Sequence, residues 1–320
     1  MATKKTRTPG PAETVLAAKV ARRFYIDGIS KRDIADELGL SRFKVARTLD
    51  QARSSGLVRI ELHYDGDIDL ELSVELSTQL GIRRCLVIES SPEVDEAALR
   101  ANLARVAAGL LEEIVEPDDV LGLSWSRTLL EMRSFLRDLA PCAVVQLTGA
   151  LSRPDVDESS IELVRDVARI AGGPAYCFYA PMIVRDAQTA SSLRTQAELA
   201  GAMAKWDQLT KAIVTLGAWK PRQSTVVDAI SPEEYEEARA AGAVCETAGM
   251  LLDAAGAPIG TRFSERVIGI DPERLRRVPE IVAIAYGTDK APAVRAAVKG
   301  QLVTTLVTHR SLALALLASA

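Results

Sequence analysis

The sequence predicts an α/β protein in which an N-terminal winged helix-turn-helix domain precedes a larger domain built on a mostly parallel sheet. The charge distribution suggests this division. The first 60 residues hold 13 Lys or Arg and 6 Asp or Glu, a net charge of +7, whereas the rest hold 26 and 37, a net charge of −11. A short basic region before a long acidic one indicates an anion-binding module joined to a separate domain. From residue 84 onward, short apolar runs alternate with helix-length amphipathic stretches, as in α/β domains.

The composition excludes several classes of protein. A hydrophobic content of 48% with 26% charged residues is typical of globular domains and excludes wholesale disorder. No apolar run reaches the length of a membrane span, and residues 1–11 lack the apolar core of a signal peptide. We therefore expect residues 1–11 to be a short disordered arm, the protein to be cytoplasmic, and no membrane to be among its partners.

Cysteine and histidine usage argues against a metal site. The chain has only two histidines, His63 and His309, and its cysteines show no CxxC spacing. All four cysteines lie in apolar surroundings, which predicts buried, reduced thiols. These cysteines are Cys85, Cys142, Cys177 and Cys245.

Three helices are predicted in the domain expected over residues 12–62. Apolar residues at helical spacing predict the first helix from Ala12 until shortly before Gly28. Ser30 and Ser41 are each placed to cap a following helix, because serine hydroxyls accept hydrogen bonds from the free amides of a first turn.

The second and third helices have the layout of a helix-turn-helix. Over residues 31–50, the small Ala35 falls where two helices cross, Gly39 falls at the turn, and Val45 falls on the inner face of the second helix of the pair. The alternative is an αα-hairpin of purely structural use. Alternating residues over 56–62 predict a short strand that forms a wing.

Basic residues on the third helix predict contacts with DNA. Its first turns are expected to present Arg42, Lys44 and Arg47 to base edges in the major groove. Phe43 lies among them and is a further candidate, the alternative being that its ring packs partly in the domain core. Basic residues of the first two helices, among them Arg23, are candidates for phosphate contacts. The predicted DNA-binding residues are Lys31, Arg32, Ser41, Arg42, Phe43, Lys44 and Arg47.

A polar break at Tyr64–Asp67 is the expected domain boundary. Residues 63–82 are expected to form a linker with a helix that packs against a partner chain, because helix-turn-helix proteins usually bind two half-sites as dimers. Residues 83–320 then form the second domain.

Eight apolar runs are candidate strands of that second domain. They are residues 85–89, 120–124, 143–147, 175–179, 212–216, 266–270, 280–286 and 302–308. In parallel sheets covered by helices, ligands bind outside the carboxyl ends of the strands. The polar loops that follow these strands are therefore the candidate binding residues.

Four such loops stand out. Residues 122–128 leave a strand and enter a helix near Thr128, so that backbone amides, hydroxyl groups and the Arg127 guanidinium could converge on a phosphate or carboxylate. The alternative is that these hydroxyl residues only cap the helix. The other loops are Gln146–Ala150, Gly287–Lys290 and Thr308–Arg310. Several such loops on one sheet predict a pocket for a polar ligand.

The order of these motifs resembles the SorC family of bacterial transcriptional regulators. The resemblance covers about Ala17 to Leu317, and its most specific pieces are Gly122–Leu129, Gln146–Gly149 and Ile281–Leu317. It implies an effector domain related to sugar-phosphate isomerases and glucosamine-6-phosphate deaminases, which binds a phosphorylated sugar or polyol and forms homodimers and homotetramers.

The resemblance also implies roles for residues of the second domain. The loop at Ser124–Thr128 would cradle the effector phosphate, Gln146 and Gly149 would line the sugar, and Lys290 would supply positive charge. The candidate effector-binding residues are Gly122, Ser124, Trp125, Ser126, Arg127, Thr128, Gln146, Gly149 and Lys290.

Three positions depart from the family's pattern. Ser126 stands where a glycine is common, His309 where an acidic residue is usual, and Val244–Glu246 where a glycine–aspartate pair is frequent. These departures bear on the identity of the effector more than on the fold.

We therefore expect a transcriptional regulator of carbohydrate metabolism that binds operator DNA under the control of a phosphorylated sugar or polyol, with no cofactor and no catalytic residues. The alternative is a sugar-phosphate isomerase or deaminase that carries a DNA-binding domain. Acid–base catalysis needs a positioned histidine or carboxylate pair. The second domain offers only His309 and, after strands, the isolated Asp253 and Asp289.

Overall fold

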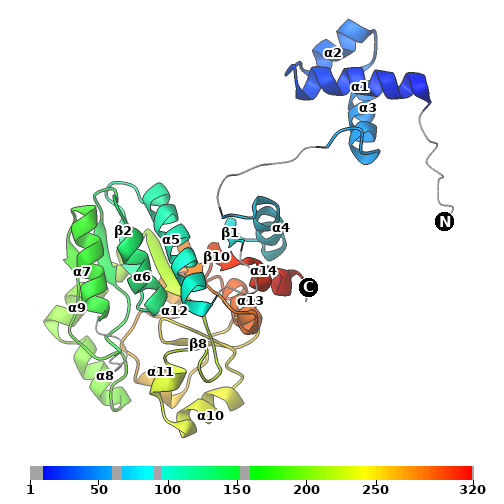
Figure 1. The fold of residues 1–320 in the computed structure, drawn as a ribbon. Coiled ribbons are helices and arrows are strands. Elements are labelled where there is room, and N and C mark those ends of the chain that lie inside the picture. The colour runs from blue at the N-terminus through cyan, green and yellow to red at the C-terminus, as the bar shows by residue number, and fades with distance from the viewer. Residues whose placement is uncertain (1–9, 60–66, 90–94, 152–158, 319–320) are drawn as a thin grey trace. The chain divides into compact units, whose positions relative to one another are not determined.

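The computed structural model describes residues 10–59, 67–89, 95–151 and 159–318 (Figure 1). The chain forms two compact units, residues 1–64 and residues 65–320. Within the described ranges, no helix is both long enough and apolar enough to cross a membrane.

The first unit contains three helices around a small apolar core. They are α1 (Pro11–Tyr25), α2 (Lys31–Leu38) and α3 (Arg42–Ser54). Val20, Ile34 and Val45, one from each helix, are fully buried in that core. The burial of one stripe on each helix explains why these short helices are stable together.

Both predicted serine caps are present in the first unit. Ser30 accepts a hydrogen bond from the amide of Asp33, and Ser41 accepts one from the amide of Lys44. Gly39 joins α2 to α3 with a φ of 63°, a conformation that glycine adopts without steric cost. The chain therefore turns sharply between the two helices, as the sequence predicts.

The expected wing is absent from the part of its span that the structure describes. Gly56–Val58 forms a turn and bends, and the amide of Val58 donates to the carbonyl of Ala52, at 3.0 Å, so that the chain folds back on α3. Residues 60–62 of the expected wing, and residues 1–9 of the expected arm, lie outside the described residues.

The second unit is built on a seven-stranded, fully parallel sheet with the order β1-β10-β9-β5-β2-β3-β4. Its strands are β1 (Arg84–Ile88), β2 (Val120–Leu123), β3 (Ala143–Gln146), β4 (Ala175–Tyr176), β5 (Lys211–Thr215), β9 (Glu280–Ile284) and β10 (Thr305–His309). Seven of the eight predicted strands are thereby confirmed.

Helices cover both faces of this sheet (Figure 1). On one face pack α5 (Glu96–Ile114), α6 (Arg127–Phe135) and α7 (Ser160–Ala171). On the other pack α4 (Leu70–Leu80), α9 (Ala197–Met203), α13 (Ala291–Lys299) and α14 (Arg310–Ala318). Successive residues of a strand point to opposite faces of the sheet. Ile88 lies in the core formed with α5, α6 and α7, and Val87 lies in the core formed with α4, α9, α13 and α14.

The predicted linker helix within residues 63–82 is α4, and the structure corrects its placement. Leu72 and Leu76 are buried in the core beside β1, so α4 is an integral part of the second unit. Val74 points outward and is 67% exposed. The expected pairing of this helix with a partner chain remains a prediction.

The strand expected over 266–270 is also corrected. The segment forms only isolated bridges, from Val267 to Ile183 and from Gly269 to Thr148. Its backbone bonds to one segment on each side, but with too few successive bonds to either to form a ladder: the amide of Ile268 donates to the carbonyl of Met182, at 2.8 Å, and that of Ile270 donates to the carbonyl of Leu147, at 2.9 Å.

A second, antiparallel sheet was not predicted from the sequence. It consists of β6 (Gly217–Ala218), β7 (Cys245–Thr247) and β8 (Met250–Leu252). Nearby lie α10 (Pro232–Ala240), α11 (Arg262–Glu265) and the short helix η2 (Val227–Ala229). The remaining helices are α8 (Ala187–Arg194), α12 (Pro272–Arg276), η1 (Ala204–Gln208) and η3 (Thr288–Lys290).

The strand order of the large sheet reverses between β2 and β5. From β2 the chain proceeds through β3 to β4 at one edge, whereas from β5 it proceeds through β9 to β10 toward the other. Loops that leave neighbouring strands in opposite directions open a crevice at the carboxyl ends of those strands. The topology therefore places a binding site at the ends of β2, β5 and β9.

Candidate functional site

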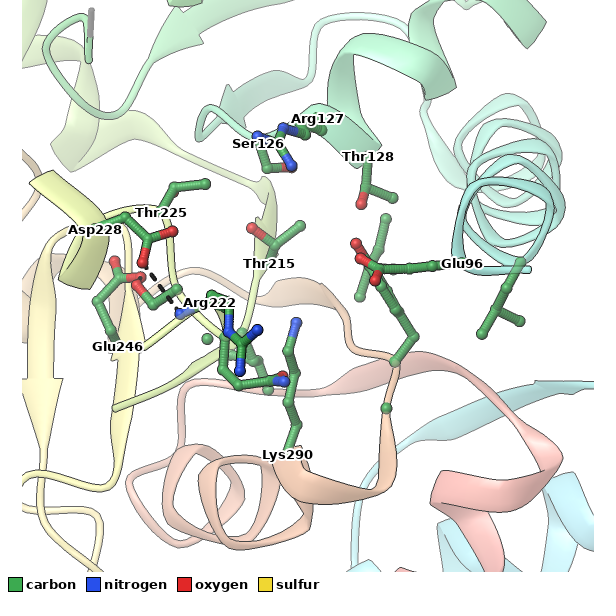
Figure 2. Close-up of a pocket in the computed structure, with 18 residues that line it drawn as sticks. Glu96, Ser126, Arg127, Thr128, Thr215, Arg222, Thr225, Asp228, Glu246 and Lys290 are labelled. Carbon is green, nitrogen blue, oxygen red and sulfur yellow. Dashed lines mark hydrogen bonds between the residues drawn. The ribbon is translucent and has the colours of Figure 1, made fainter. Parts of the chain in front are cut away.

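A cavity of about 340 Å³ lies where the topology predicts it (Figure 2). Its walls come from the start of α5, the first turn of α6, the segment 215–228 after β5, β7 and the segment 284–290 after β9. Three cations and three carboxylates are among the lining residues: Arg127, Arg222, Lys290, Glu96, Asp228 and Glu246. The cavity is thus strongly polar and carries both signs of charge.

The first turn of α6 forms one wall. Ser126 caps this helix, accepting a hydrogen bond from the amide of Leu129 at 3.1 Å, and Arg127 and Thr128 follow it along the same wall. The amino-terminal end of a helix carries partial positive charge and unpaired amides, so it attracts anions. Three of the predicted effector residues, Ser126, Arg127 and Thr128, therefore lie at the cavity.

Lys290 stands across the cavity from that helix end (Figure 2). Its ammonium nitrogen lies 4.5 Å from the ring centroid of Tyr286, and it forms no ion pair with any described residue. Burial lowers the pKa of Lys290, and Glu96 and Glu246 act in the opposite direction. A cation with little solvent and no fixed counter-ion favours an anionic or polar ligand beside it.

His309, in the predicted loop Thr308–Arg310, contacts the turn that precedes Lys290. It is 6% exposed, and its Nε2 accepts a hydrogen bond from the amide of Gly287 at 3.0 Å. Burial lowers the pKa of His309, which keeps the ring neutral and able to accept. Gly287 has a φ of 89°, so this bond fixes the tight turn that precedes Lys290.

Two carboxylates of the cavity, Glu246 and Asp228, accept hydrogen bonds that fix their positions. Glu246 accepts from the hydroxyl of Ser224, at 2.9 Å, and from the amide of Gly249, at 2.8 Å. Burial raises the pKa of Glu246, because a charged carboxylate loses hydration there. Asp228 accepts from the amide of Arg222, at 3.1 Å, which holds Arg222 at its positive φ of 64° (Figure 2).

Sequence reasoning missed most of this acidic half of the cavity. Glu246 appeared only as a departure from the family pattern, and Glu96, Arg222 and Asp228 were not identified. Glu96 begins α5, Arg222 lies in an irregular loop and Asp228 lies in the three-residue helix η2, and no periodicity in the sequence identifies any of these positions. The loop that holds Arg222 is unusual in its backbone, because Arg222 has a positive φ, and this angle cannot be recognised from the sequence.

Five predicted effector residues do not line the cavity in the described structure. They are Gly122, Ser124, Trp125, Gln146 and Gly149. Gln146 is fully buried and bonds to the Thr148 carbonyl (2.8 Å), the Ser160 hydroxyl (3.1 Å) and the Phe178 amide (3.0 Å). Its side chain therefore joins β3 to its neighbours instead of facing a sugar.

The two glycines of this group are required by packing. A Cβ on Gly149 would lie 2.6 Å from the backbone of Pro181, and one on Gly122 would lie 2.7 Å from a methyl carbon of Leu147. Ser124 and Trp125 are buried, at 2% and 8% exposure. These residues shape the sheet behind the cavity.

The thiols match the expectation of buried cysteines. Cys85, Cys142 and Cys245 are buried and Cys177 is half-buried, all four with free thiols. Burial raises the pKa of Cys85 to about 12 and that of Cys142 to about 11, so both remain protonated and unreactive at neutral pH. Among the described residues, no group of three or more His, Cys, Asp or Glu is arranged to hold a metal ion.

The first unit presents a separate candidate surface at the start of α3. Arg42, Phe43, Lys44 and Arg47 are all exposed. Phe43 is 85% exposed, so the alternative that its ring packs in the core is wrong. Within the described ranges, none of the three cations forms an ion pair.

The other predicted DNA-binding residues have mixed surroundings. Ser41 caps α3, Lys31 lies 5.4 Å from the ring centroid of Phe24, and Arg32 is exposed. Arg23, a candidate for phosphate contact, instead pairs with Glu37 (2.6 Å) and Asp27 (3.1 Å).

Comparison with known proteins finds relatives along nearly the whole chain. Residues 65–318 match the family model described as "Putative sugar-binding domain". Over 317 residues, covering 96% of this chain and 94% of the relative, the chain is 29% identical to the transcriptional regulator LsrR of Enterobacter sp. (strain 638). Over 306 residues, 93% of this chain and 96% of the relative, it is 25% identical to the sorbitol operon regulator of Klebsiella pneumoniae.

Solved structures show the same fold. The full-length sorbitol operon regulator SorC from Klebsiella pneumoniae superimposes with a TM-score of 0.73 at 23% identity, over 97% of this chain and all of that one. A transcriptional regulator from Streptococcus pneumoniae TIGR4 superimposes with a TM-score of 0.71 at 20% identity, over 78% of this chain and 96% of that one. The chain belongs to the SorC family of transcriptional regulators with a sugar-binding domain.

Proposed function

We propose that this regulator binds operator DNA through α3 and that a phosphorylated sugar or polyol in the cavity controls that binding. The observation that carries the effector half of the proposal is the cavity at the strand reversal, where the start of α6 faces Lys290 across a space of about 340 Å³. Small-molecule sites have volumes of about this size and a few placed polar groups.

The two kinds of charge in the cavity suit the two ends of such a ligand. Arg127 and the first turn of α6 would bind the phosphate, since guanidinium groups and helix amides both donate to phosphate oxygens. Glu246 and Asp228 would accept hydrogen bonds from sugar hydroxyls. A phosphorylated polyol presents both an anion and several hydroxyl donors in one molecule.

The observation that carries the DNA half is the basic start of α3, whose cations form no ion pair with another described residue. Arg42, Lys44 and Arg47 would contact base edges and phosphates when α3 lies in the major groove. Ser41 would fix the start of the helix, and Lys31 and Arg32, at the start of α2, would contact the backbone of the duplex. We further propose that the protein acts as a homodimer or homotetramer, because two copies of α3 are needed to read two half-sites.

A thermal-shift screen tests the effector half. The full chain is heated with a panel of sugar and polyol phosphates, with their unphosphorylated counterparts and with inorganic phosphate alone. A ligand that binds only the folded protein raises the melting temperature in proportion to the logarithm of its excess concentration over Kd. We expect at least one phosphorylated compound to do so, and its unphosphorylated counterpart to have little effect.

Matched variants assign that shift to the cavity. Arg127→Gln and Lys290→Met should abolish it, whereas Arg277→Gln, which removes an equivalent charge from the surface of the same unit, should leave it unchanged. A shift retained in both cavity variants would contradict the proposed site. Turnover of the same compounds by the unaltered chain would instead support the enzyme alternative.

A further inference from the structure

Phe43 has the most exposed large apolar side chain in the described part of the molecule, at 85%. It is the second residue of α3, whose buried residues are Val45, Thr48, Leu49 and Ala52. At 3.6 residues per turn those four form one stripe, and Phe43 lies almost opposite its centre. The ring therefore stands in the middle of the outward face of α3, one helical turn before Arg47.

Exposed apolar residues that occur singly are common and need no explanation by themselves. Phe43 differs because of its neighbours. Arg42 and Lys44 flank it and Arg47 follows one turn later, and none of the three is neutralised by a carboxylate in the described structure. Cations on both sides of the ring would bring this turn of α3 against the duplex and remove water from the ring.

The chemistry of the major groove limits what the ring can contact there. Base edges present hydrogen-bond donors and acceptors, and the C5-methyl group of thymine is the one apolar group among them. A phenyl ring placed against donors or acceptors would leave them without partners, which is unfavourable. Against a thymine methyl group, both surfaces lose water without losing a hydrogen bond.

We propose that Phe43 reads the C5-methyl group of a thymine in each operator half-site, and that it is a specificity-determining residue of this regulator. This inference rests on the proposed DNA-binding function, because it assigns the base that one residue of the same surface recognises. It predicts a thymine at one fixed position of each half-site, next to the bases contacted by Arg42 and Arg47.

Deoxyuridine substitution provides the test, since uracil lacks only the methyl group of thymine. The full chain first selects duplexes from a random library, and the affinity for the enriched duplex is measured by fluorescence anisotropy at fixed salt. Each thymine is then replaced by deoxyuridine, one pair of symmetric positions at a time. We expect one pair to weaken binding by about fourfold per half-site, the effect of burying one methyl or methylene group.

Variants of Phe43 connect that loss to the ring. Phe43→Ala should bind the thymine and deoxyuridine duplexes with equal affinity, and Phe43→Leu, which keeps an apolar contact, should retain part of the preference for thymine. Because Phe43 makes no contact with the core, both variants should unfold at the same temperature as the unaltered chain.

The outcomes separate this inference from the function on which it rests. If no duplex is enriched, the proposed DNA binding fails and the inference fails with it. If a duplex is enriched but no deoxyuridine substitution weakens binding, or the loss persists in Phe43→Ala, DNA binding stands and the inference is overturned. A change in oligomeric state in Phe43→Ala, with the thymine preference intact, would show that the ring contacts a second copy of this chain and would also overturn it.

Discussion

The basic residues at the start of α3 differ from many arginines of the second unit in what they contact. On α3, Arg42, Lys44 and Arg47 form no ion pair in the described structure. In the second unit, many arginines are bound to carboxylates of distant segments; examples are Arg133–Asp166 (2.6 Å), Arg262–Glu237 (2.6 Å), Arg274–Asp207 (2.9 Å) and Arg83–Glu280.

The difference shows what each set of charges is available for. Exposed ion pairs contribute about 0–1 kcal/mol each to stability. In such a pair the carboxylate bonds to the cation and offsets its charge. In the pairs named above, a carboxylate of the same unit offsets the charge of each arginine. The cations of α3, which form no ion pair within the part of the chain that the structure describes, remain available for an anion supplied from outside.

The largest expected effect tests this contrast directly. We expect Arg42→Ala/Arg47→Ala to weaken binding to the selected duplex by roughly 2–6 kcal/mol, because each base contact by an arginine is worth about 1–3 kcal/mol. The control is Arg185→Ala/Arg239→Ala, which removes two exposed charges from the second unit, where each is paired with a neighbouring carboxylate. Anisotropy titrations at one salt concentration compare the two, and an equal loss in both would show that net charge alone controls binding.

Glycine provides a second contrast between the units. Gly149 in the second unit is required by space, since a Cβ there would lie 2.6 Å from the backbone of Pro181. We expect Gly149→Ala to lower the free energy of unfolding by roughly 1–3 kcal/mol, the usual cost of overpacking, with or without a sugar phosphate present. Urea unfolding of the second unit, followed by tryptophan fluorescence, measures this change.

Gly201 is the matched control for Gly149. It lies within α9, where a Cβ would meet no atom within 4 Å. Gly201→Ala should therefore be neutral or stabilising by up to about 1 kcal/mol, because alanine loses less backbone entropy in a helix. Should Gly149→Ala instead leave stability intact and reduce only effector binding, Gly149 would regain the ligand role that the sequence suggested.

In the first unit, Gly39 is required by backbone conformation. A Cβ there would meet no atom within 4 Å, but the residue adopts a φ of 63°. We expect Gly39→Ala to destabilise the α2–α3 turn by about 1–2 kcal/mol, and Gly39→Asn to have a smaller effect, since asparagine tolerates this conformation better. Native-state hydrogen exchange of the α2 and α3 amides reports the local change, and equal protection in Gly39→Ala and the unaltered chain would contradict it.

Gly39 and Gly149 also show which structural features could be predicted from the sequence and which could not. Gly39 was identified correctly because its role depends on residues within a few positions: Ser30, Ser41 and the apolar stripe of each helix. The contact of Gly149 with Pro181 could not be predicted, because Pro181 lies 32 residues away in the chain, and the effector role of Gly149 came only from the family resemblance. Local rules predicted the helices of the first unit and seven parallel strands, since those patterns are periodic.

The cavity could be predicted only in part for the same reason. Ser126–Thr128 and Lys290 directly follow strands or begin helices, so the rule for ligand sites in parallel sheets locates them. Glu96 and Glu246 reach the cavity because α5 and β7 pack where they do, and no spacing in the sequence records that packing. The short strands β6, β7 and β8 have two or three residues each, too few for an alternating pattern.

The smallest expected effect concerns the pH dependence of stability in the second unit, whose one histidine is His309. His309 accepts from the amide of Gly287 only while neutral, and burial lowers its pKa below the unfolded value of 6.5. As the pH falls, the unfolded chain therefore takes up this proton first, so His309 stabilises the second unit above pH 6.5 and that contribution is lost as the pH falls through the folded pKa. Glu246, whose pKa burial raises, acts in the opposite sense, because its contribution is lost as the pH rises.

His309→Gln isolates the histidine effect, since the glutamine carbonyl can still accept from Gly287 but does not titrate in this range. We expect the stability of the unaltered second unit to fall below pH 6.5 relative to that of His309→Gln, by about 1 kcal/mol, the worth of one hydrogen bond. Both proteins retain His63 and Glu246, so the difference between their stability profiles reports His309 alone. Parallel profiles from pH 7 to pH 5 would mean that the turn at Gly287, and with it the position of Lys290, does not depend on this ring.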